Sequence, residues 1–234
     1  ATPTVNASAN QSNVTATPTP TVNATATPTP TVAANQQVCG TTIDSSITLT
    51  QDVSADLTSP GGSSCFYVIG GNFTFDCAGH SITETGAGQS GSGIYILASS
   101  DITVKNCVVN GFGEGIILLN SAGPITIQGN TLNNNTFGIR VENSAHNNVL
   151  NNIAVGNTRG ISLSSAPYNT VTGNNASNSV ADGFDLINSN SNTISNNRFC
   201  NSFTKDVYST GSSSNTASGN ACTTTTGFSC NTAC

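Results

Sequence analysis

The chain repeats one short phrase every 22 or 23 residues. A glycine opens the phrase, and apolar residues stand one and three positions later, as in GIYIL, GIILL, GIRVE, GISLS and GFDLI. These glycines are Gly93, Gly115, Gly138, Gly160 and Gly183. Alternation of apolar and other residues is typical of a strand with one buried face. A short strand in every unit, without helical periodicity, predicts that each unit is one coil of a β-solenoid.

The period extends in both directions and contains a second repeating position. One step forward reaches DVYST at Asp206, and one step back reaches GNFTF at Gly71. Asparagine recurs at intervals of 22 to 24 residues, at Asn106, Asn130, Asn152, Asn174, Asn197 and Asn220. In a parallel β-helix, coils lie about 4.8 Å apart and equivalent side chains form columns. Asparagines in a column can bond amide to amide, and Asn tolerates the left-handed backbone of a bend.

The fold class follows from these columns. We expect an all-β, right-handed parallel β-helix with 22–23-residue coils over residues 39–222, preceded by an extended Thr/Pro-rich tail over residues 1–38 and closed by a Cys-rich cap over residues 223–234. Ile116, Ile139 and Ile161 should form one continuous internal row.

Charge and hydropathy exclude two kinds of partner. Only 7% of the residues are charged, the net charge is −6, and the five cations are scattered, so a nucleic-acid surface is not expected. No stretch approaches the roughly 20 apolar residues of a membrane span. The chain begins at Ala without a hydrophobic leader, which we interpret as a mature product whose export signal has been removed.

The chain has an even number of cysteines, and none forms a Cys-x-x-Cys pair. They are Cys39, Cys65, Cys77, Cys107, Cys200, Cys222, Cys230 and Cys234. This pattern predicts disulfides near the two ends of the solenoid and an oxidising compartment, hence a secreted or cell-surface protein. Cys39–Cys65 and Cys77–Cys107 are the favoured N-terminal pairs, and the last four cysteines allow three connectivities.

Glycosylation sequons cluster in the tail. Asn-x-Ser/Thr occurs at Asn6, Asn10, Asn13, Asn23, Asn72, Asn134 and Asn175. Alternating Thr and Pro favours an extended backbone, which is typical of a glycosylated stalk.

The tail can also connect subunits. Its 38 residues reach roughly 120 Å when extended, whereas eight coils stand about 40 Å tall. We therefore hypothesise that the tail lies along another copy of the chain as an added strand, building a homopolymer. Its apolar anchors would be Val5, Val14, Val22 and Val32. A chain starting near Cys39 should then stay folded but monomeric.

The sequence offers no obvious active site. Asp182 and Asp185 are the nearest pair of acids, but Arg159, Asp182 and Lys205 alternate in sign on successive coils, which favours a surface charge ladder. Arg140 and Asp185 share an outward position, separated by one coil. We predict no catalytic residue from this pattern.

Metal and sugar sites are not evident either. His80 and His146 are single and lack metal-ligand spacing, and Tyr95 and Tyr208 stand five coils apart, too far to build a stacking platform. The acids Asp44, Asp52 and Asp56 are interpreted as turn caps. No cofactor is expected.

One segment carries a family resemblance. The stretch GNFTFDCAGHSITETGAGQSGSGIYI (71–96) resembles the right-handed parallel β-helix repeat proteins of the NosD-like and pectate-lyase-like superfamily, and NTVTGNNASNS and NTISNNRFCNS are similar to that group's coil repeat. The resemblance implies the fold for residues 39–222. The group includes lyases, hydrolases, epimerases, periplasmic accessory proteins and surface proteins, and none of its catalytic motifs matches here.

These observations lead to one main prediction and one alternative. The main prediction is a secreted, non-enzymatic structural glycoprotein, the subunit of an extracellular filament joined through its tail. The alternative is a carbohydrate-binding or polysaccharide-cleaving β-helix protein.

Overall fold

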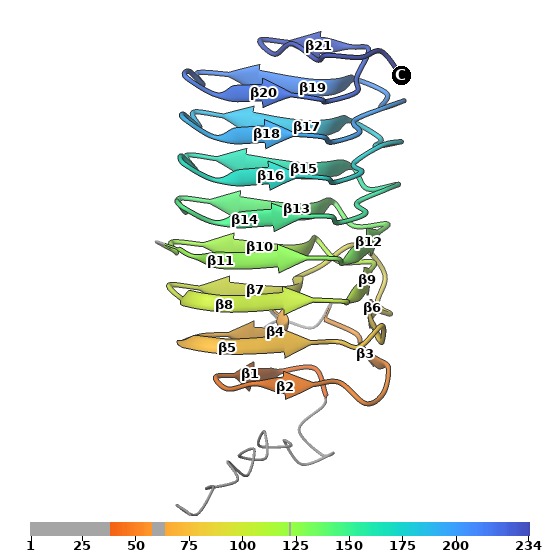
Figure 1. Cartoon of the computed structure of the whole chain (residues 1–234). Coiled ribbons are helices and arrows are strands. Elements are labelled where there is room, and N and C mark those ends of the chain that lie inside the picture. Colours follow the sequence, from red (N-terminus) through yellow and green to blue (C-terminus); the bar gives the residue numbers. More distant parts are fainter. Residues whose placement is uncertain (1–37, 58–63, 122) are drawn as a thin grey trace, which may run out of the picture.

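A computed structural model describes residues 38–57, 64–121 and 123–234. The chain winds into a parallel β-solenoid, in which each coil stacks on the one before it (Figure 1). No helix occurs among the described residues, so none of them forms an apolar helix long enough to cross a membrane. The predicted all-β parallel fold is confirmed.

The largest sheet, called the nine-stranded sheet below, takes one strand from each coil. In spatial order its strands are β1 (Thr41–Ile43), β4 (Ser64–Val68), β7 (Ser92–Leu97), β10 (Glu114–Leu119), β13 (Phe137–Glu142), β15 (Arg159–Ser164), β17 (Asp182–Ile187), β19 (Lys205–Thr210) and β21 (Thr225–Thr226). All its pairings are parallel.

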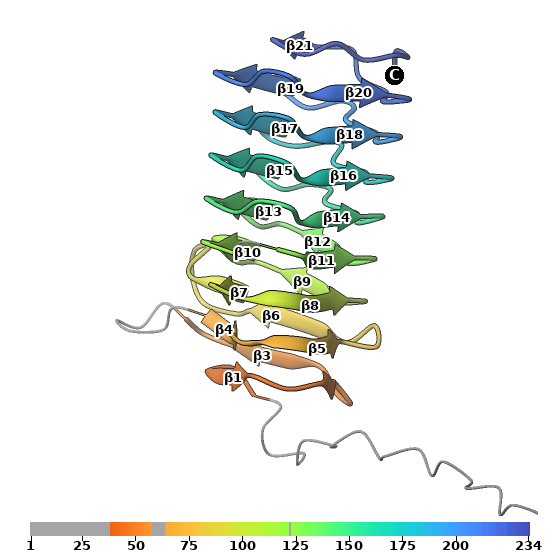
Figure 2. The same ribbon diagram turned by 60° about the vertical axis from the view of Figure 1, so that its left-hand side comes forward.

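Two further sheets complete the coils. The eight-stranded sheet contains β2 (Ile47–Thr48), β5 (Gly71–Asp76), β8 (Ser100–Lys105), β11 (Ile125–Gln128), β14 (Asn148–Leu150), β16 (Thr170–Thr172), β18 (Thr193–Ser195) and β20 (Thr216–Ser218). The four-stranded sheet contains β3 (Val53–Ala55), β6 (Ser81–Glu84), β9 (Val108–Asn110) and β12 (Thr131–Asn133). Figure 2 shows the two long sheets as separate stacks that face different directions.

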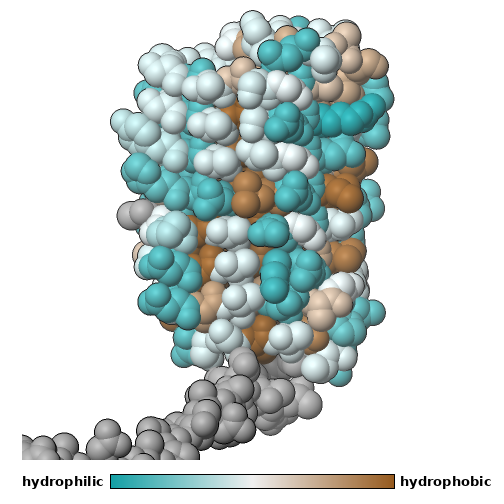
Figure 3. All heavy atoms as spheres, in the orientation of Figure 1, coloured by the Kyte–Doolittle hydropathy of each residue, from teal (hydrophilic) through white to brown (hydrophobic). Residues whose placement is uncertain are grey.

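The interior is built from columns of aliphatic side chains. Ile94 pairs with Ile116, Ile116 with Ile139, and Ile139 with Ile161, and all four are fully buried. The predicted internal row is therefore confirmed. The face of the molecule seen in Figure 3 is mostly hydrophilic or neutral, with apolar residues in separate patches.

One part of the repeat was placed wrongly from the sequence. GNFTF at Gly71 does not belong to the glycine series, because it lies in β5 of the eight-stranded sheet. The strand that pairs with β7 is β4, in which Phe66 pairs with Ile94, a separation of 28 residues. The Gly-rich turn before β7 lengthens this coil, so a fixed step of 22 residues selects the wrong strand.

The repeated glycines are required by contact between neighbouring coils. A Cβ on Gly160 would lie 2.5 Å from the carbonyl oxygen of Gly183 and 2.7 Å from the Cβ of Ala176. A Cβ on Gly138 would lie 2.5 Å from the carbonyl oxygen of Gly160. Main chain cannot yield as a flexible side chain does, so only glycine fits at these positions.

Gly160→Ala should therefore lower the free energy of unfolding by roughly 1–3 kcal/mol, the usual cost of overpacking. Urea unfolding followed by circular dichroism measures the change. Ser164→Ala, at a half-buried position of the same strand, is the control and should stay within about 0.5 kcal/mol of the wild type. Equal losses in both variants would contradict the steric explanation.

Asparagines form a buried ladder that links the coils. The side-chain amide of Asn130 donates to Oδ1 of Asn152, and the same bond joins Asn152 to Asn174, Asn174 to Asn197 and Asn197 to Asn220, each at 3.0 Å. Oδ1 of the second residue also accepts the main-chain N–H of the first. This part of the expected column is present.

Asn106 is not part of the ladder, contrary to expectation. Cys107 occupies that position instead, and its N–H donates to Oδ1 of Asn130 at 2.9 Å. Asn106 is exposed, has a left-handed backbone with φ of 56°, and donates to Asp76. The interval of 24 residues between Asn106 and Asn130 is one longer than the usual 22 or 23, which indicates that the ladder position is shifted by one residue, to Cys107.

Four disulfides use all eight cysteines. They join Cys39 to Cys65, Cys77 to Cys107, Cys200 to Cys234 and Cys222 to Cys230. Disulfide bonding is thus confirmed. The first two bonds are the pairs favoured from the sequence, and the last two fix the connectivity that the sequence left open.

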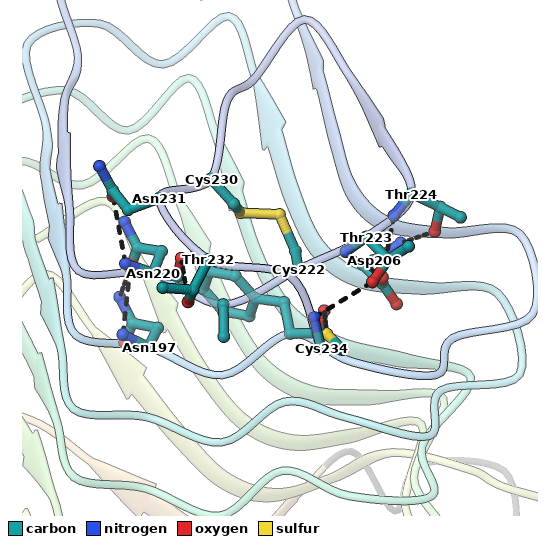
Figure 4. Close-up of a disulfide and its surroundings, with 12 residues drawn as sticks. Asn197, Asp206, Asn220, Cys222, Thr223, Thr224, Cys230, Asn231, Thr232 and Cys234 are labelled. Atoms are coloured by element: carbon teal, nitrogen blue, oxygen red, sulfur yellow. Dashed lines mark hydrogen bonds between the residues drawn. A yellow bond between two sulfur atoms is a disulfide. The ribbon is translucent and has the colours of Figure 1, made fainter.

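The disulfides at the C-terminal end hold a short cap over the last coil. In Figure 4, Cys222–Cys230 lies beside the end of the asparagine ladder, where Asn220 donates its N–H to Oδ1 of Asn231 at 3.3 Å. The buried carboxylate of Asp206 accepts the N–H groups of Thr223 and Thr224 at 2.8 and 3.0 Å. The division of the chain at residues 38/39 and 222/223 stays a prediction.

Candidate functional site

The outer face of the nine-stranded sheet carries two neighbouring groups of ion-paired side chains. Strand register forms one outward column from Thr42 to Thr226. The seven residues between these two threonines are called the central column: Tyr67, Tyr95, Ile117, Arg140, Ser162, Asp185 and Tyr208. A second outward column lies at the start of the strands, where Ser92, Glu114, Phe137 and Arg159 are in register, as are Asp182 and Lys205 on the next two coils.

The least exposed ion-paired acids of this face are two aspartates on β17. Nε of Arg159, on the adjacent coil, lies 2.9 Å from Oδ2 of Asp185 and 3.9 Å from Oδ2 of Asp182. The Asp185 side chain is 3% exposed and the Asp182 side chain 11% exposed, whereas Arg159 is 39% exposed and lies over them. The structure therefore differs from the expected surface charge ladder, because both carboxylates are buried.

The aspartate pair is arranged to hold a proton. Burial raises the pKa of Asp185 to about 7, and the negative charge of Asp182 and a hydrogen bond with it act in the same direction against the opposing effect of Arg159. Among the described residues, Oδ1 of Asp182 and Oδ1 of Asp185 have no hydrogen-bond partner. One proton on the pair reduces the repulsion between two buried carboxylates and supplies a donor.

The raised pKa of Asp185 predicts a stability that depends on pH. The folded protein binds this proton more tightly than the unfolded chain, whose Asp has a pKa near 3.8. The contribution is full below about pH 4 and is lost as pH rises through about 7, a change of a few kcal/mol. Urea unfolding of wild type and Asp185→Asn at pH 4 and pH 8 measures it as a difference, in which other titrations cancel. A difference independent of pH would contradict the assignment.

A second charged group adjoins the first. Arg140 lies 3.2 Å from Oε1 of Glu114 and 2.6 Å from Oε2 of Glu142. The Phe137 ring joins the two groups, since the guanidinium carbons of Arg140 and Arg159 lie 5.2 and 5.4 Å from its centroid. Two arginines and four acids thus lie together on four successive coils, on strands β10, β13, β15 and β17.

Aromatic side chains lie on both sides of the charged groups. Tyr67 and Tyr95 stack with ring centroids 5.1 Å apart and an interplanar angle of 7°. The sequence prediction of isolated tyrosines missed Tyr67, because the long coil before β7 hid its register. Beyond the aspartates, Tyr208 follows Asp185 in the central column, and Phe203, just before β19, is 90% exposed.

The remaining site predictions fall elsewhere. Asn72 and Asn134 are exposed and Asn175 is partly buried, while Asn6, Asn10, Asn13 and Asn23 lie outside the described residues, as do Val5, Val14, Val22 and Val32. Glycosylation and the tail contacts stay predictions. Asp52 accepts the N–H of Ser81 and contacts His80, which fits a turn-capping role.

A cavity under the C-terminal cap is a weaker candidate. It exists because Ser209 and Ala217 occupy the core positions that Leu186 and Ile194 fill one coil earlier. Its lining contains no charged side chain, so it offers no group of perturbed pKa.

Comparison with known proteins gives a family and a fold. A family model described as "Periplasmic copper-binding protein (NosD)" matches residues 55–225. No curated protein matches the chain. Solved structures do, at 11–16% identity, and the chain spans between 33 and 56% of their length.

Three of these structures represent the matches. The periplasmic alginate epimerase AlgG has a TM-score of 0.61 at 14% identity, covering 77% of this chain and 55% of that one. Pectate lyase Pel9A has a TM-score of 0.55 at 15% identity, covering 81% and 56%. DFA-IIIase from Arthrobacter chlorophenolicus A6 has a TM-score of 0.54 at 16% identity, covering 76% and 46%.

These comparisons correct one prediction. The expectation of a protein without enzymatic activity is contradicted, because the structures that share its fold are an epimerase, a lyase and DFA-IIIase. At these identities the likeness itself establishes the fold alone. Four disulfides and a family described as periplasmic are consistent with secretion.

The residues do not fit the copper named in the family description. Copper favours Cys, Met and His ligands, but the chain has no Met, its cysteines are all in disulfides, and it has two His. No group of three His, Cys, Asp or Glu with metal-binding geometry occurs among the described residues.

Proposed function

We propose a catalytic function for this chain, which belongs to the family of the periplasmic copper-binding protein NosD. In this proposal the outer face of the nine-stranded sheet binds a polysaccharide and catalyses a proton transfer on it. The solved structures of this fold named above include an alginate epimerase and a pectate lyase. The proposal replaces the structural role that the sequence favoured with the alternative that it left open.

The aspartate pair is the observation that carries the proposal. Only 7% of the residues of this chain are charged, yet two carboxylates and a guanidinium are packed together on adjacent coils. A buried carboxyl whose pKa is raised toward 7 lowers the free energy of unfolding at neutral pH. Carboxyls with such perturbed pKa values cluster at functional sites. Asp185, with a pKa of about 7, suits a general acid or base at neutral pH.

The chemistry divides between the three side chains. Asp185 holds the proton and donates it to the glycosidic oxygen as the C–O bond to the leaving sugar breaks, while a water molecule bonds to the anomeric carbon and releases its proton to the solvent. Asp182, the more exposed acid of the pair, accepts hydrogen bonds from sugar hydroxyls. Arg159 covers both carboxylates with a long side chain rather than with main chain, so a rotation of that side chain opens them to the substrate.

The test is an activity screen on defined polymers. Purified protein is incubated with polygalacturonate, alginate and a neutral β-glucan, and new reducing ends are measured. Absorbance of unsaturated products separates elimination from hydrolysis. Activity should be lost in Asp185→Asn and retained in the control Asp44→Asn, which changes an exposed acid outside this face. Wild type that neither binds nor cleaves any of these polymers would contradict the proposal.

Assembly into a filament through residues 1–38 stays a separate prediction. It requires only the tail and a neighbouring copy, so it is compatible with a catalytic face on the solenoid. Light scattering of a chain that starts at Cys39 tests it, since loss of the tail should leave a monomer.

A further inference from the structure

We infer that the ligand of this face is a long polymer that lies along the solenoid axis and contacts aromatic side chains at both ends of the central column. The inference rests on the proposed function and specifies its substrate: an extended polysaccharide chain rather than a small sugar. It also assigns two binding subsites, one remote from the aspartate pair and one beside it.

The length of the central column supports a polymeric ligand. Its seven residues, from Tyr67 to Tyr208, come from seven consecutive coils. With coils about 4.8 Å apart, the six intervals span roughly 29 Å. A single sugar covers only a small part of this distance, whereas an unbranched chain can contact every coil.

The remote subsite consists of Tyr67 and Tyr95. Their rings stack on each other and are half-buried, which fixes the direction of both phenols. Neither hydroxyl has a hydrogen-bond partner among the described residues, although a tyrosine hydroxyl can both donate and accept. Sugar hydroxyls have the same capacity. The pair therefore presents two oriented, unused hydrogen-bonding groups, which lie four coils (Tyr95) and five coils (Tyr67) away from Asp185.

The near subsite consists of Phe203 and Tyr208. Tyr208 pairs directly with Asp185, and Lys205, two residues after Phe203, pairs with Asp182. Phe203 is 90% exposed and Tyr208 36% exposed. A lone exposed aromatic residue is ordinary on a protein surface. Here two exposed aromatic residues, Phe203 and Tyr208, lie on the coil that follows the aspartates. The apolar face of the sugar ring next to the reacting bond would pack on their side chains.

Tyr168 provides a matched comparison. It is 55% exposed and stacks on His146 with ring centroids 5.1 Å apart. It lies in the turn between β15 and β16, at the corner between the two long sheets and off the central column. Exposure alone would make it equivalent to Phe203. Phe203, however, lies just before the strand starts where Asp182 and Lys205 pair, whereas Tyr168 lies beyond the ends of the strands, outside the proposed ligand path.

Binding measured against chain length tests the inference. Size-fractionated oligogalacturonates and alginate oligosaccharides are titrated into wild type, Tyr67→Phe/Tyr95→Phe, Phe203→Ala and Tyr168→Ala by calorimetry. Wild-type affinity should rise with oligomer length until the oligomer spans the column. The double Phe variant keeps the ring stack, so it should fold normally, and it should bind long oligomers roughly tenfold more weakly and short ones unchanged.

The other variants complete the test. Phe203→Ala should weaken both short and long oligomers by roughly three- to tenfold, and Tyr168→Ala should weaken neither. If the double Phe variant binds long oligomers as wild type does, or if wild-type affinity is independent of length, the inference is overturned while the proposed function stands. If wild type binds no oligomer and releases no product, the proposed function fails, and the inference fails with it.

Discussion

Asp185→Asn is expected to reduce turnover of the polysaccharide by roughly 10²- to 10⁴-fold, the usual contribution of a general acid or base. The amide has the size of the protonated carboxyl but cannot release a proton. Because Asp185 is buried and its ionisation is unfavourable, the amide should not destabilise the fold at neutral pH. Initial rates with saturating polymer measure the loss, and circular dichroism verifies the fold.

The pH profile separates a chemical role from a structural one. If Asp185 acts as the acid, the wild-type rate should fall as pH rises through about 7, where its pKa lies. The small residual rate of Asp185→Asn should lack this step. A variant with full activity, or a wild-type profile that is flat between pH 6 and pH 8, would contradict the assignment of Asp185. Asp44→Asn controls for the removal of an acid as such.

Asn174→Ala is expected to cause the largest loss of stability, roughly 3–5 kcal/mol. Asn174 lies in the middle of the asparagine ladder and is 1% exposed. Its Oδ1 accepts two bonds from Asn152, and its amide donates to the Val149 carbonyl and to Asn197. Alanine would leave several buried polar groups without partners. Urea denaturation measures the change in the free energy of unfolding.

Asn175 is the control for this substitution. It is the next residue, is partly buried, and its Oδ1 has no hydrogen-bond partner. Asn175→Ala should therefore change the free energy of unfolding by less than about 1 kcal/mol. Similar losses in the two variants would mean that the ladder contributes little beyond any asparagine of the corner.

The fold could be predicted from the sequence because equivalent residues of successive coils contact each other. Ile116, Ile139 and Ile161 share one environment, so the same residue type recurs at a nearly fixed interval. The prediction was wrong where coil length changed. Phe66 and Ile94 are 28 residues apart, and a period of 22 therefore selected Gly71 instead.

The candidate site was harder to predict for a different reason. Register correctly placed Arg140, Ser162 and Asp185 in one outward column, but an outward position does not imply exposure. The burial of Asp185 depends on the side chains packed around it, including Arg159. Tyr67 was missed because its neighbour Tyr95 lies one lengthened coil away. The repeat in the sequence tells which column a residue belongs to. The exposed fraction of its side chain depends on the neighbouring side chains in the folded protein.

The asparagine ladder makes the solenoid a set of interchangeable modules. Each rung bonds to the rung before it, to the rung after it and to a main-chain carbonyl of the preceding coil, and Asn130, Asn152 and Asn174 make the same bonds. Duplication or excision of one whole period would rejoin equivalent rungs without a mismatch. Gain or loss of whole coils in the gene can thus lengthen or shorten the distance between Tyr95 and Asp185 in steps of one coil. The length of ligand that fits between the two proposed subsites would change by the same steps.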